Sequence, residues 1–372
     1  MTTLAVLSLL AWLYLALAHG GFWRDGERLG KATPSAFPGV AVVVPARDEA
    51  EGIAASIGSL LAQDYAGAFR IYLVDDNSTD NTAAIAHALQ GGELLTLIDG
   101  AKRPGGWAGK LWAVHQGVAA GNAELVFLTD ADIVHDPAHL SSLVAKLQSD
   151  GVDMVSEMVQ LRCDSTAERA LIPAFVYFFA LLYPFGWVND GLRATAAAAG
   201  GTVLIRRTAL ERIGGIAAIS GELIDDVALA TRVKRGGRIW LGHSRLARSV
   251  RPYPYWVDVW RMIARSAYVQ LNLSPVVLIG SLLGLCLLFL VPPVATVTGS
   301  VVGGLAWIVM TITFWPTLRR FGLSSFWAPA LPAIACFYMA ATLGSALDHH
   351  RGRGVVWKNR AYKGNAAKGS VT

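Results

Sequence analysis

The stretch Val-Asp-Asp-Asn-Ser-Thr-Asp (Val74–Asp80) decides the expected fold, because it follows a short apolar run, Ile71–Leu73, that is typical of a buried strand. A second acidic pair, Asp130 and Asp132, follows the apolar run Leu125–Leu128 in the same way. In open α/β sheets, ligands bind at the carboxyl ends of the parallel strands. The sequence therefore predicts an α/β fold whose acidic residues gather at one edge of a sheet.

Further apolar runs alternate with segments of helical composition on both sides of these two clusters. We expect strands at Val40–Val44, Leu94–Ile98, Met154–Val159, Val203–Ile205 and Ile239–Leu241, and helices at Asp48–Leu61, Ala83–Leu89, Leu111–Ala119 and Val227–Arg235. Strands that alternate with helices imply a mostly parallel, Rossmann-like sheet with helices on both faces.

Composition indicates a protein that works at a membrane. The chain of 372 residues is 53% apolar and only 16% charged, which is too apolar for an ordinary soluble domain. The long apolar runs lie at the chain ends, whereas residues 35–270 resemble a globular domain. The net charge of +5 arises in a basic tail, residues 348–372. An anionic membrane surface is therefore the expected partner of the tail, and nucleic acid is not expected. The three cysteines show neither disulfide nor metal spacing.

The N-terminal run Leu4–Ala18 is apolar, and basic residues follow it rather than precede it. This pattern predicts an uncleaved transmembrane anchor over residues 1–22, with the next domain in the cytoplasm. A cleaved signal peptide is the alternative, since Ala16-Leu17-Ala18 would fit a cleavage site.

The C-terminal region, residues 271–347, is expected to hold two or three membrane spans. Two of them are Ser274–Val291 and Thr296–Pro316, joined by a turn at Pro292–Pro293. Phe326–Leu347 either spans the membrane or lies at its surface, which leaves the side of the tail open. The aromatic stretch Leu171–Val188 is expected to be an interfacial helix, with a buried core helix as the alternative.

Acidic residues that follow strands are candidates for metal binding. The carboxylates of Asp130 and Asp132 are hard oxygen ligands that select Mg²⁺ or Mn²⁺, and such an ion can bridge two phosphate oxygens. Lys110 begins a helix after the glycine-rich stretch Arg103–Gly109, which favours phosphate contact. The glycine spacing is not that of a Walker A loop.

Three further groups complete the predicted site. The first two strands end side by side, one at Pro45, Ala46 and Glu49 and the other at Asp75 and Asp76. Carboxylates there can accept hydrogen bonds from a nucleobase or a ribose. The alternative is that these residues only form turns. Asp225 and Asp226 begin a helix, so Asp226 is a candidate general base; helix capping by Asp225 is the alternative. Arg265 lies one turn after Arg261 and could pair with a diphosphate or with the membrane surface.

Taken together, these residues resemble the family 2 glycosyltransferases of the GT-A fold. Val44–Glu49 is similar to that family's Pro-x-x-Asn-Glu motif, with Asp48 in place of Asn, and Val74–Asp80 is similar to its nucleotide-holding element. Lys110 falls at the family's lysine, and Asp130 and Asp132 fall at its metal-binding Asp-x-Asp. Asp226 falls at its base and Arg265 at its arginine. The resemblance implies a nucleotide-sugar donor held by Pro45, Ala46, Glu49, Asp75, Asp76, Lys110, Asp130 and Arg265, a metal held by Asp130 and Asp132, and Asp226 as catalytic base. Met262 and Ser266 replace the Gln/Arg and Trp around the arginine, which counts against a processive polymerase.

The glycine-rich loop and the segment Trp357–Tyr362 resemble a narrower group, the hopene-associated glycosyltransferases of bacteria. The resemblance implies a multi-pass enzyme of the bacterial inner membrane that moves a sugar from a nucleotide-sugar donor to a lipid acceptor, in hopanoid or related lipid metabolism. Two alternatives remain: a synthase of polyprenyl-phosphate sugars, and a non-catalytic scaffold that binds nucleotide sugars.

Overall fold

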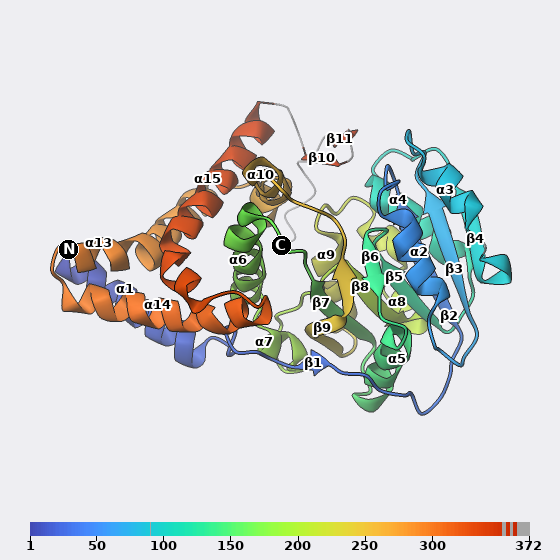
Figure 1. Cartoon of the computed structure of the whole chain (residues 1–372), viewed down its shortest axis with the longest axis horizontal. Helices are drawn as coiled ribbons and strands as arrows, with labels where there is room; N and C mark the ends of the chain where they lie inside the picture. The colour runs from blue at the N-terminus through green and yellow to red at the C-terminus, as the bar shows by residue number, and fades with distance from the viewer. Residues whose placement is uncertain (90, 352–354, 358–359, 363–372) are drawn as a thin grey trace, which may run out of the picture. The chain divides into compact units, whose positions relative to one another are not determined.

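A computed structural model of the chain describes residues 1–89, 91–351, 355–357 and 360–362 (Figure 1). The chain divides into two compact units. The sheet unit comprises Glu27–Arg162 and Trp187–Arg251, and the helical unit comprises Met1–Gly26, Cys163–Gly186 and the described part of Pro252–Gly364. Each unit is described by itself below.

The sheet unit is built on one mixed sheet. Its strands are β1 (Arg28–Leu29), β2 (Val40–Ala46), β3 (Phe69–Asp75), β4 (Leu95–Asp99), β5 (Leu125–Thr129), β6 (Ile133–His135), β7 (Met154–Gln160), β8 (Thr202–Arg206) and β9 (Ile239–Ser249). They run in the order β1-β9-β7-β8-β5-β2-β3-β4, with β6 beside β9. Most pairs are parallel, as expected, but β8 runs antiparallel to both of its neighbours. The expected α/β fold is confirmed.

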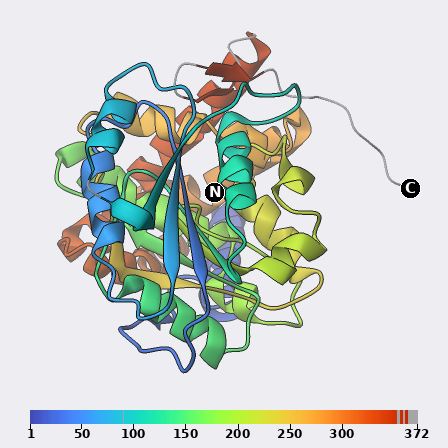
Figure 2. The same cartoon turned by 90° about the vertical axis from the view of Figure 1, so that its right-hand side faces the viewer.

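Helices cover both faces of this sheet, with α2 (blue) on one side and α4 (teal) on the other (Figure 2). The helices of the unit are α2 (Ile53–Leu61), α3 (Thr82–Ala88), α4 (Gly109–Ala120), α5 (His139–Ser149), α7 (Phe185–Asn189, which begins in the helical unit), α8 (Arg207–Arg212) and α9 (Asp225–Lys234), with 3-10 turns at Gly92–Leu94 and Ile216–Ile219. The central strand β2 is buried along its whole length, as expected for a strand covered on both faces.

The first helix begins later than predicted. We expected it from Asp48, but α2 begins at Ile53. Asp48 has a positive φ of 50°, which a helix cannot accommodate, and its carboxylate accepts a hydrogen bond from the backbone N–H of Thr79 at 2.7 Å. The acidic residues before α2 therefore form a turn instead of the first helical turn.

The strand register brings acidic residues to one edge. Ala46 lies level with Asp75, and Asp75 lies level with Asp99, at the carboxyl ends of three adjacent parallel strands. Gly100 passes so close to this edge that a Cβ atom there would lie 2.6 Å from the carbonyl oxygen of Asp75. Asp130 follows directly after β5, the other neighbour of β2. The strand ends are thus drawn together as the sequence predicted.

The helical unit contains three helices that are long and apolar enough to span a membrane. These spans are Pro275–Val297, Val301–Arg320 and Ser325–His350. Within them the elements are α12 (Pro275–Leu285), a π-helical turn (Cys286–Leu290), α13 (Val291–Val297), α14 (Val301–Arg320), a 3-10 turn (Ser325–Ala330) and α15 (Leu331–His350). The shorter apolar helix α1 (Thr2–Ala18) packs against them, and the indole N–H of Trp12 donates to the carbonyl of Leu288 at 2.7 Å. These spans indicate membrane association.

The expected turn at Pro292–Pro293 is wrong. Both prolines lie inside the continuous helical span Pro275–Val297, directly after its π-helical turn, where the wider hydrogen-bond pattern accommodates residues that lack a backbone N–H. The chain reverses instead around Gly299, whose φ is 88°, and Ser300 caps α14. Most of the expected basic tail, with Arg353, Lys358, Lys363 and Lys368, lies outside the described residues.

The aromatic stretch expected at a membrane surface forms α6 (Thr166–Leu182), which is buried instead among α10 (Trp256–Ala264), α14 and α15. A capping box begins this helix: Ser165 accepts from the backbone N–H of Glu168, and Glu168 accepts from that of Ser165. The hydroxyl of Tyr177 is hydrogen-bonded to that of Thr313 at 2.8 Å, inside the unit. The buried core helix that the sequence left as an alternative is therefore the structure of this segment. A short helix, α11 (Ala267–Gln270), follows α10.

Candidate active site

A pocket in the sheet unit opens beside the carboxyl end of β5 and gathers four charged side chains. Lys110 comes from the first turn of α4, Asp130 follows β5, and Asp225 with Asp226 forms the first turn of α9. The remaining lining residues are apolar or small: Pro45, Leu111, Val114, Leu128, Thr129, Gly200, Val203, Ile216, Ile219 and Leu229. A few charged groups in a mostly apolar pocket are a common arrangement in ligand and active sites.

Lys110 is the cation at the centre of this pocket. Its Nζ lies 2.8 Å from an oxygen of Asp130 and 3.4 Å from an oxygen of Asp225. Burial lowers its pKa, but the negative charges of Asp130 and Asp225 outweigh that effect, so the pKa of Lys110 is raised and the ammonium stays charged. One ammonium therefore faces three carboxylates.

Asp226 is held by two backbone N–H groups. Its Oδ2 accepts from Gly200 at 2.9 Å, and its Oδ1 accepts from Val227 at 2.8 Å. Burial and the neighbouring charge of Asp225 raise its pKa to about 6, against the lowering effect of Lys110 and of the two hydrogen bonds. A carboxylate with a pKa near 6 is ionised at neutral pH and still basic enough to accept a proton, as a general base must.

Asp130 and Asp132 are candidate ligands for a divalent ion. Burial raises the pKa of Asp130, Lys110 lowers it, and the charge of Asp132 raises it further. Two carboxylates of like charge near each other fit a divalent cation, because such an ion stabilises both charges at once. The side chain of Asp130 is 35% exposed, so its oxygens remain accessible from the pocket. Among the described residues, no group of three or more His, Cys, Asp or Glu side chains is arranged so that it could hold a metal ion by itself. The site thus fits an ion whose remaining ligands come from a bound diphosphate or from water.

Asp132 belongs to a second ionic cluster, which sequence reasoning missed. Its Oδ2 lies 2.7 Å from Nε of Arg251, while Nη2 of the same guanidinium lies 2.7 Å from Glu49. Ser249 also donates to Asp132, at 3.2 Å. Arg251 is 119 residues away from Asp132 in the sequence, so no local pattern could have revealed the pair.

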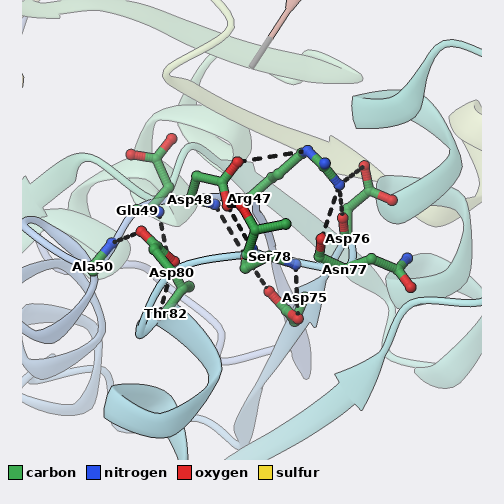
Figure 3. A network of polar contacts seen from close by, with 11 residues as sticks. Arg47, Asp48, Glu49, Ala50, Asp75, Asp76, Asn77, Ser78, Asp80 and Thr82 are labelled. Atoms are coloured by element: carbon green, nitrogen blue, oxygen red, sulfur yellow. Dashed lines mark hydrogen bonds and ion pairs between the residues drawn. The ribbon is translucent and has the colours of Figure 1, made fainter. Parts of the chain in front are cut away.

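The predicted nucleotide-binding residues lie in a network of polar contacts after β2 and β3 (Figure 3). Arg47 donates to the backbone carbonyls of Asp76 and Asn77, and its guanidinium lies 3.9 Å from the carboxylate of Asp76. Asp75 accepts from the hydroxyl and the backbone N–H of Ser78. Asp75 and Asp76 are both buried. This network fixes the shape of the loop that follows β3.

The structure brings most of the predicted site residues together in the sheet unit. Pro45, Lys110, Asp130 and Asp226 line one pocket. Ala46 ends β2, and Glu49, Asp75, Asp76 and Asp132 lie in the two neighbouring polar clusters. Arg265 is the C-terminal cap residue of α10 in the helical unit, so its contact with a donor stays a prediction. The chemical role of each residue also stays a prediction.

Comparison with known proteins identifies the family. The family described as "Glycosyl transferase family 21" matches residues 3–368. An uncharacterized glycosyltransferase of Mycobacterium tuberculosis is 36% identical over 117 residues, which is 32% of this chain and 47% of the relative. The beta-monoglucosyldiacylglycerol synthase of Synechocystis is 33% identical over 138 residues, 33% of this chain and 28% of the relative. The matches thus span about half the length, or less, of these curated relatives.

A solved structure with the same fold is the mannosyltransferase PcManGT of Pyrobaculum calidifontis, in complex with GDP-Man and Mn²⁺. It is 19% identical, with a TM-score of 0.58, and the alignment covers 92% of this chain and 99% of that one. Membership of a glycosyltransferase family confirms the broader part of the sequence prediction. The narrower parts, family 2 and the hopene-associated group, stay predictions.

Proposed function

Because the chain belongs to glycosyl transferase family 21, we propose that it is a membrane-bound, inverting glycosyltransferase. It moves a sugar from a nucleotide-sugar donor to the hydroxyl of a lipid, in the metabolism of hopanoids or related lipids. The observation that carries the proposal is the pocket in which Asp226, with a pKa of about 6, faces Lys110.

Asp226 acts as the general base in this proposal. It takes the proton of the acceptor hydroxyl while the acceptor oxygen forms a bond to the anomeric carbon of the donor sugar. The bond from that carbon to the diphosphate breaks, and the nucleoside diphosphate leaves with the bonding electrons. Gly200 and Val227 hold both oxygens of Asp226 by backbone hydrogen bonds, so the carboxylate keeps a fixed direction.

The departing diphosphate gains negative charge, which the site must stabilise. Lys110 supplies one positive charge, held close to Asp130 at 2.8 Å. The pocket nevertheless carries more negative than positive charge, which would repel a diphosphate by itself. Mg²⁺ or Mn²⁺ on Asp130 and Asp132 would supply the missing positive charge as a Lewis acid. Arg265 is proposed to contact the same diphosphate.

A lipid acceptor is supported by the helical unit. Three helices could span a membrane, and α10 exposes apolar and aromatic side chains beside the cationic Arg261. Tyr255, just before α10, is 69% exposed, and Trp256 and Val257 are 49% and 48% exposed. Aromatic side chains of this kind favour the interface between lipid and water. The name of the Synechocystis relative also refers to a glycosylated diacylglycerol.

Release of nucleoside diphosphate by the detergent-purified protein tests the proposal. A panel of UDP- and GDP-sugars is incubated with Mn²⁺ or with EDTA, and with or without bacterial lipid extract. We expect one donor to be consumed, only with the metal and faster with the lipid. Donor binding without release in any combination would favour a non-catalytic scaffold and contradict the proposal.

A product in which the sugar is linked to a phosphate would instead identify a polyprenyl-phosphate sugar synthase. Its acceptor is already ionised and needs no general base, so Asp226→Asn would leave its activity unchanged. Mass spectrometry of the lipid product distinguishes the two linkages.

A further inference from the structure

Four polar side chains form a buried chain that ends at the pocket with Thr129, although none of them belongs to the predicted site. Glu157 on β7, His139 on α5, His135 on β6 and Thr129 on β5 are each exposed by 4% or less. They come from four different elements of the sheet unit. Buried polar groups are costly unless they are paired, so such a chain requires a physical explanation.

The contacts run without a break from Glu157 to Thr129. Nε2 of His139 lies 2.6 Å from Oε1 of Glu157. The two Nδ1 atoms of His139 and His135 are 2.9 Å apart, and Nε2 of His135 lies 3.2 Å from the hydroxyl oxygen of Thr129. The Thr129 hydroxyl in turn donates to the carbonyl of Gly201 at 2.8 Å. Nε2 of His139 and Oε1 of Glu157 are thus in close contact, although the two atoms are not well aligned for a hydrogen bond.

These contacts fix where the protons are. Because a carbonyl can only accept, Thr129 donates its single hydroxyl proton to the carbonyl of Gly201. The Thr129 oxygen must then accept from His135, which donates from Nε2. Burial and the neighbouring His139 hold the pKa of His135 well below its usual value, so His135 is neutral and its Nδ1 accepts. His139 must then carry a proton on Nδ1.

The end of this chain lies next to the proposed catalytic groups. Gly201 follows Gly200, whose backbone N–H donates to Asp226, and Thr129 precedes Asp130. The same turn is also held from β7, since the hydroxyl of Ser156 accepts from the backbone N–H of Ala199 at 2.9 Å. The buried chain therefore ties the segment that carries Asp130 to the turn that orients Asp226.

We propose that Glu157, His139, His135 and Thr129 are positioning residues, which set the direction of the Thr129 hydroxyl and thereby hold the Gly200–Gly201 turn against Asp226. This inference rests on the proposed function of Asp226. Misplacing a catalytic group by a fraction of an ångström reduces the chemical step more than it reduces substrate binding.

Substitution of Thr129 tests the proposal by kinetics. Thr129→Val keeps the shape and removes the hydroxyl, and we expect kcat to fall about tenfold with KM for the donor changed less than twofold. Thr129→Ser restores the hydroxyl and is expected to regain most of the wild-type kcat. Ser142→Ala is the matched control, because it removes another buried hydroxyl, on α5, that donates to Ala138 without contact to the turn. Its kcat should equal that of the wild type even if its Tm falls.

Nitrogen NMR of histidine-labelled protein tests the proton arrangement without any activity assay. We expect His135 to be neutral with its proton on Nε2, and His139 to carry a proton on Nδ1. A His135 proton on Nδ1 would overturn the inference, since Thr129 would then donate to His135 and release Gly201. An unchanged kcat in Thr129→Val would overturn it as well. Absence of transfer by the wild-type protein would instead contradict the proposed function while the NMR result still stood.

Discussion

Asp130 and Asp132 are separated by one residue, yet they belong to two different ionic clusters of the sheet unit. Asp130 shares the ammonium of Lys110 with Asp225, and Asp226 lies in the same pocket. Asp132 shares the guanidinium of Arg251 with Glu49, at 2.7 Å on each side. Three carboxylates thus compete for one cation in the first cluster, and two carboxylates share one in the second.

The difference shows how surroundings give one residue type different properties. In the first cluster the pKa values of Asp130 and Asp226 are raised, in both cases first by burial. A nearby cation or a bound proton therefore stabilises these two carboxyl groups most strongly. In the second cluster both carboxylates already contact the guanidinium of Arg251. The first cluster is therefore suited to proton transfer and to binding a cation. In the second cluster, Arg251 holds the side chain of Asp132, one of the proposed metal ligands, when no metal is bound.

The largest effect on activity is expected from substitution of Asp226, the proposed general base. Asp226→Asn removes the proton acceptor, so transfer to the lipid should fall by about 10³-fold, a typical contribution of general base catalysis. Donor affinity, measured by calorimetry, should stay within about threefold because the pocket keeps its shape. Glu222→Gln, an exposed carboxylate three residues before α9, is the matched control. Full transfer by Asp226→Asn would remove Asp226 from the mechanism.

The second effect concerns the cation of the first cluster. Lys110→Met leaves three carboxylates without their ammonium, so kcat should fall roughly 10²-fold, as for loss of one charge-stabilising group at the reacting centre. Lys102→Met, an exposed lysine on the preceding loop, should have no effect on steady-state kinetics. Equal losses in the two variants would mean that Lys110 has no special role.

The third effect is a pH dependence that follows from Asp226. With a pKa of about 6, the carboxylate is mostly protonated at pH 5 and mostly ionised at pH 7, so kcat/KM should be about tenfold lower at pH 5. Because Lys110 lowers the pKa of Asp226, the midpoint should move to higher pH in the residual activity of Lys110→Met. A pH-independent kcat/KM between these values would argue against an ionising base.

The smallest effect belongs to the second cluster. Arg251→Gln removes the cation beside Asp132, so Mn²⁺ should bind up to roughly fivefold more tightly, in line with about 1 kcal/mol for a partly exposed ion pair. The free Mn²⁺ signal in electron paramagnetic resonance measures this affinity without donor or acceptor. Arg248→Gln, which changes an exposed arginine near the end of β9, three residues before Arg251, is the control. Weaker Mn²⁺ binding by Arg251→Gln would show that Arg251 supports the metal site instead.

The sequence predicted those parts of the site that local patterns encode. The acidic clusters at Asp75 and Asp130 each follow an apolar strand, and the parallel register brings the ends of β2, β3 and β4 together. The ion pair of Arg251 with Asp132 depends on where β9 returns to the sheet, which no short stretch specifies. The buried chain could have been detected in the sequence at Glu157, because this is a charged residue within the apolar strand Met154–Gln160. A charge in such a place needs a buried partner, and that partner is His139.

The anomeric configuration of the glycolipid product tests the central claim most directly. With the donor identified, the protein is incubated with that donor, lipid and Mn²⁺, and the anomeric proton coupling of the product is measured by NMR. A single base that deprotonates the acceptor predicts a configuration opposite to that of the donor. A product that retains the donor's configuration would contradict direct attack assisted by Asp226, and with it the proposed mechanism.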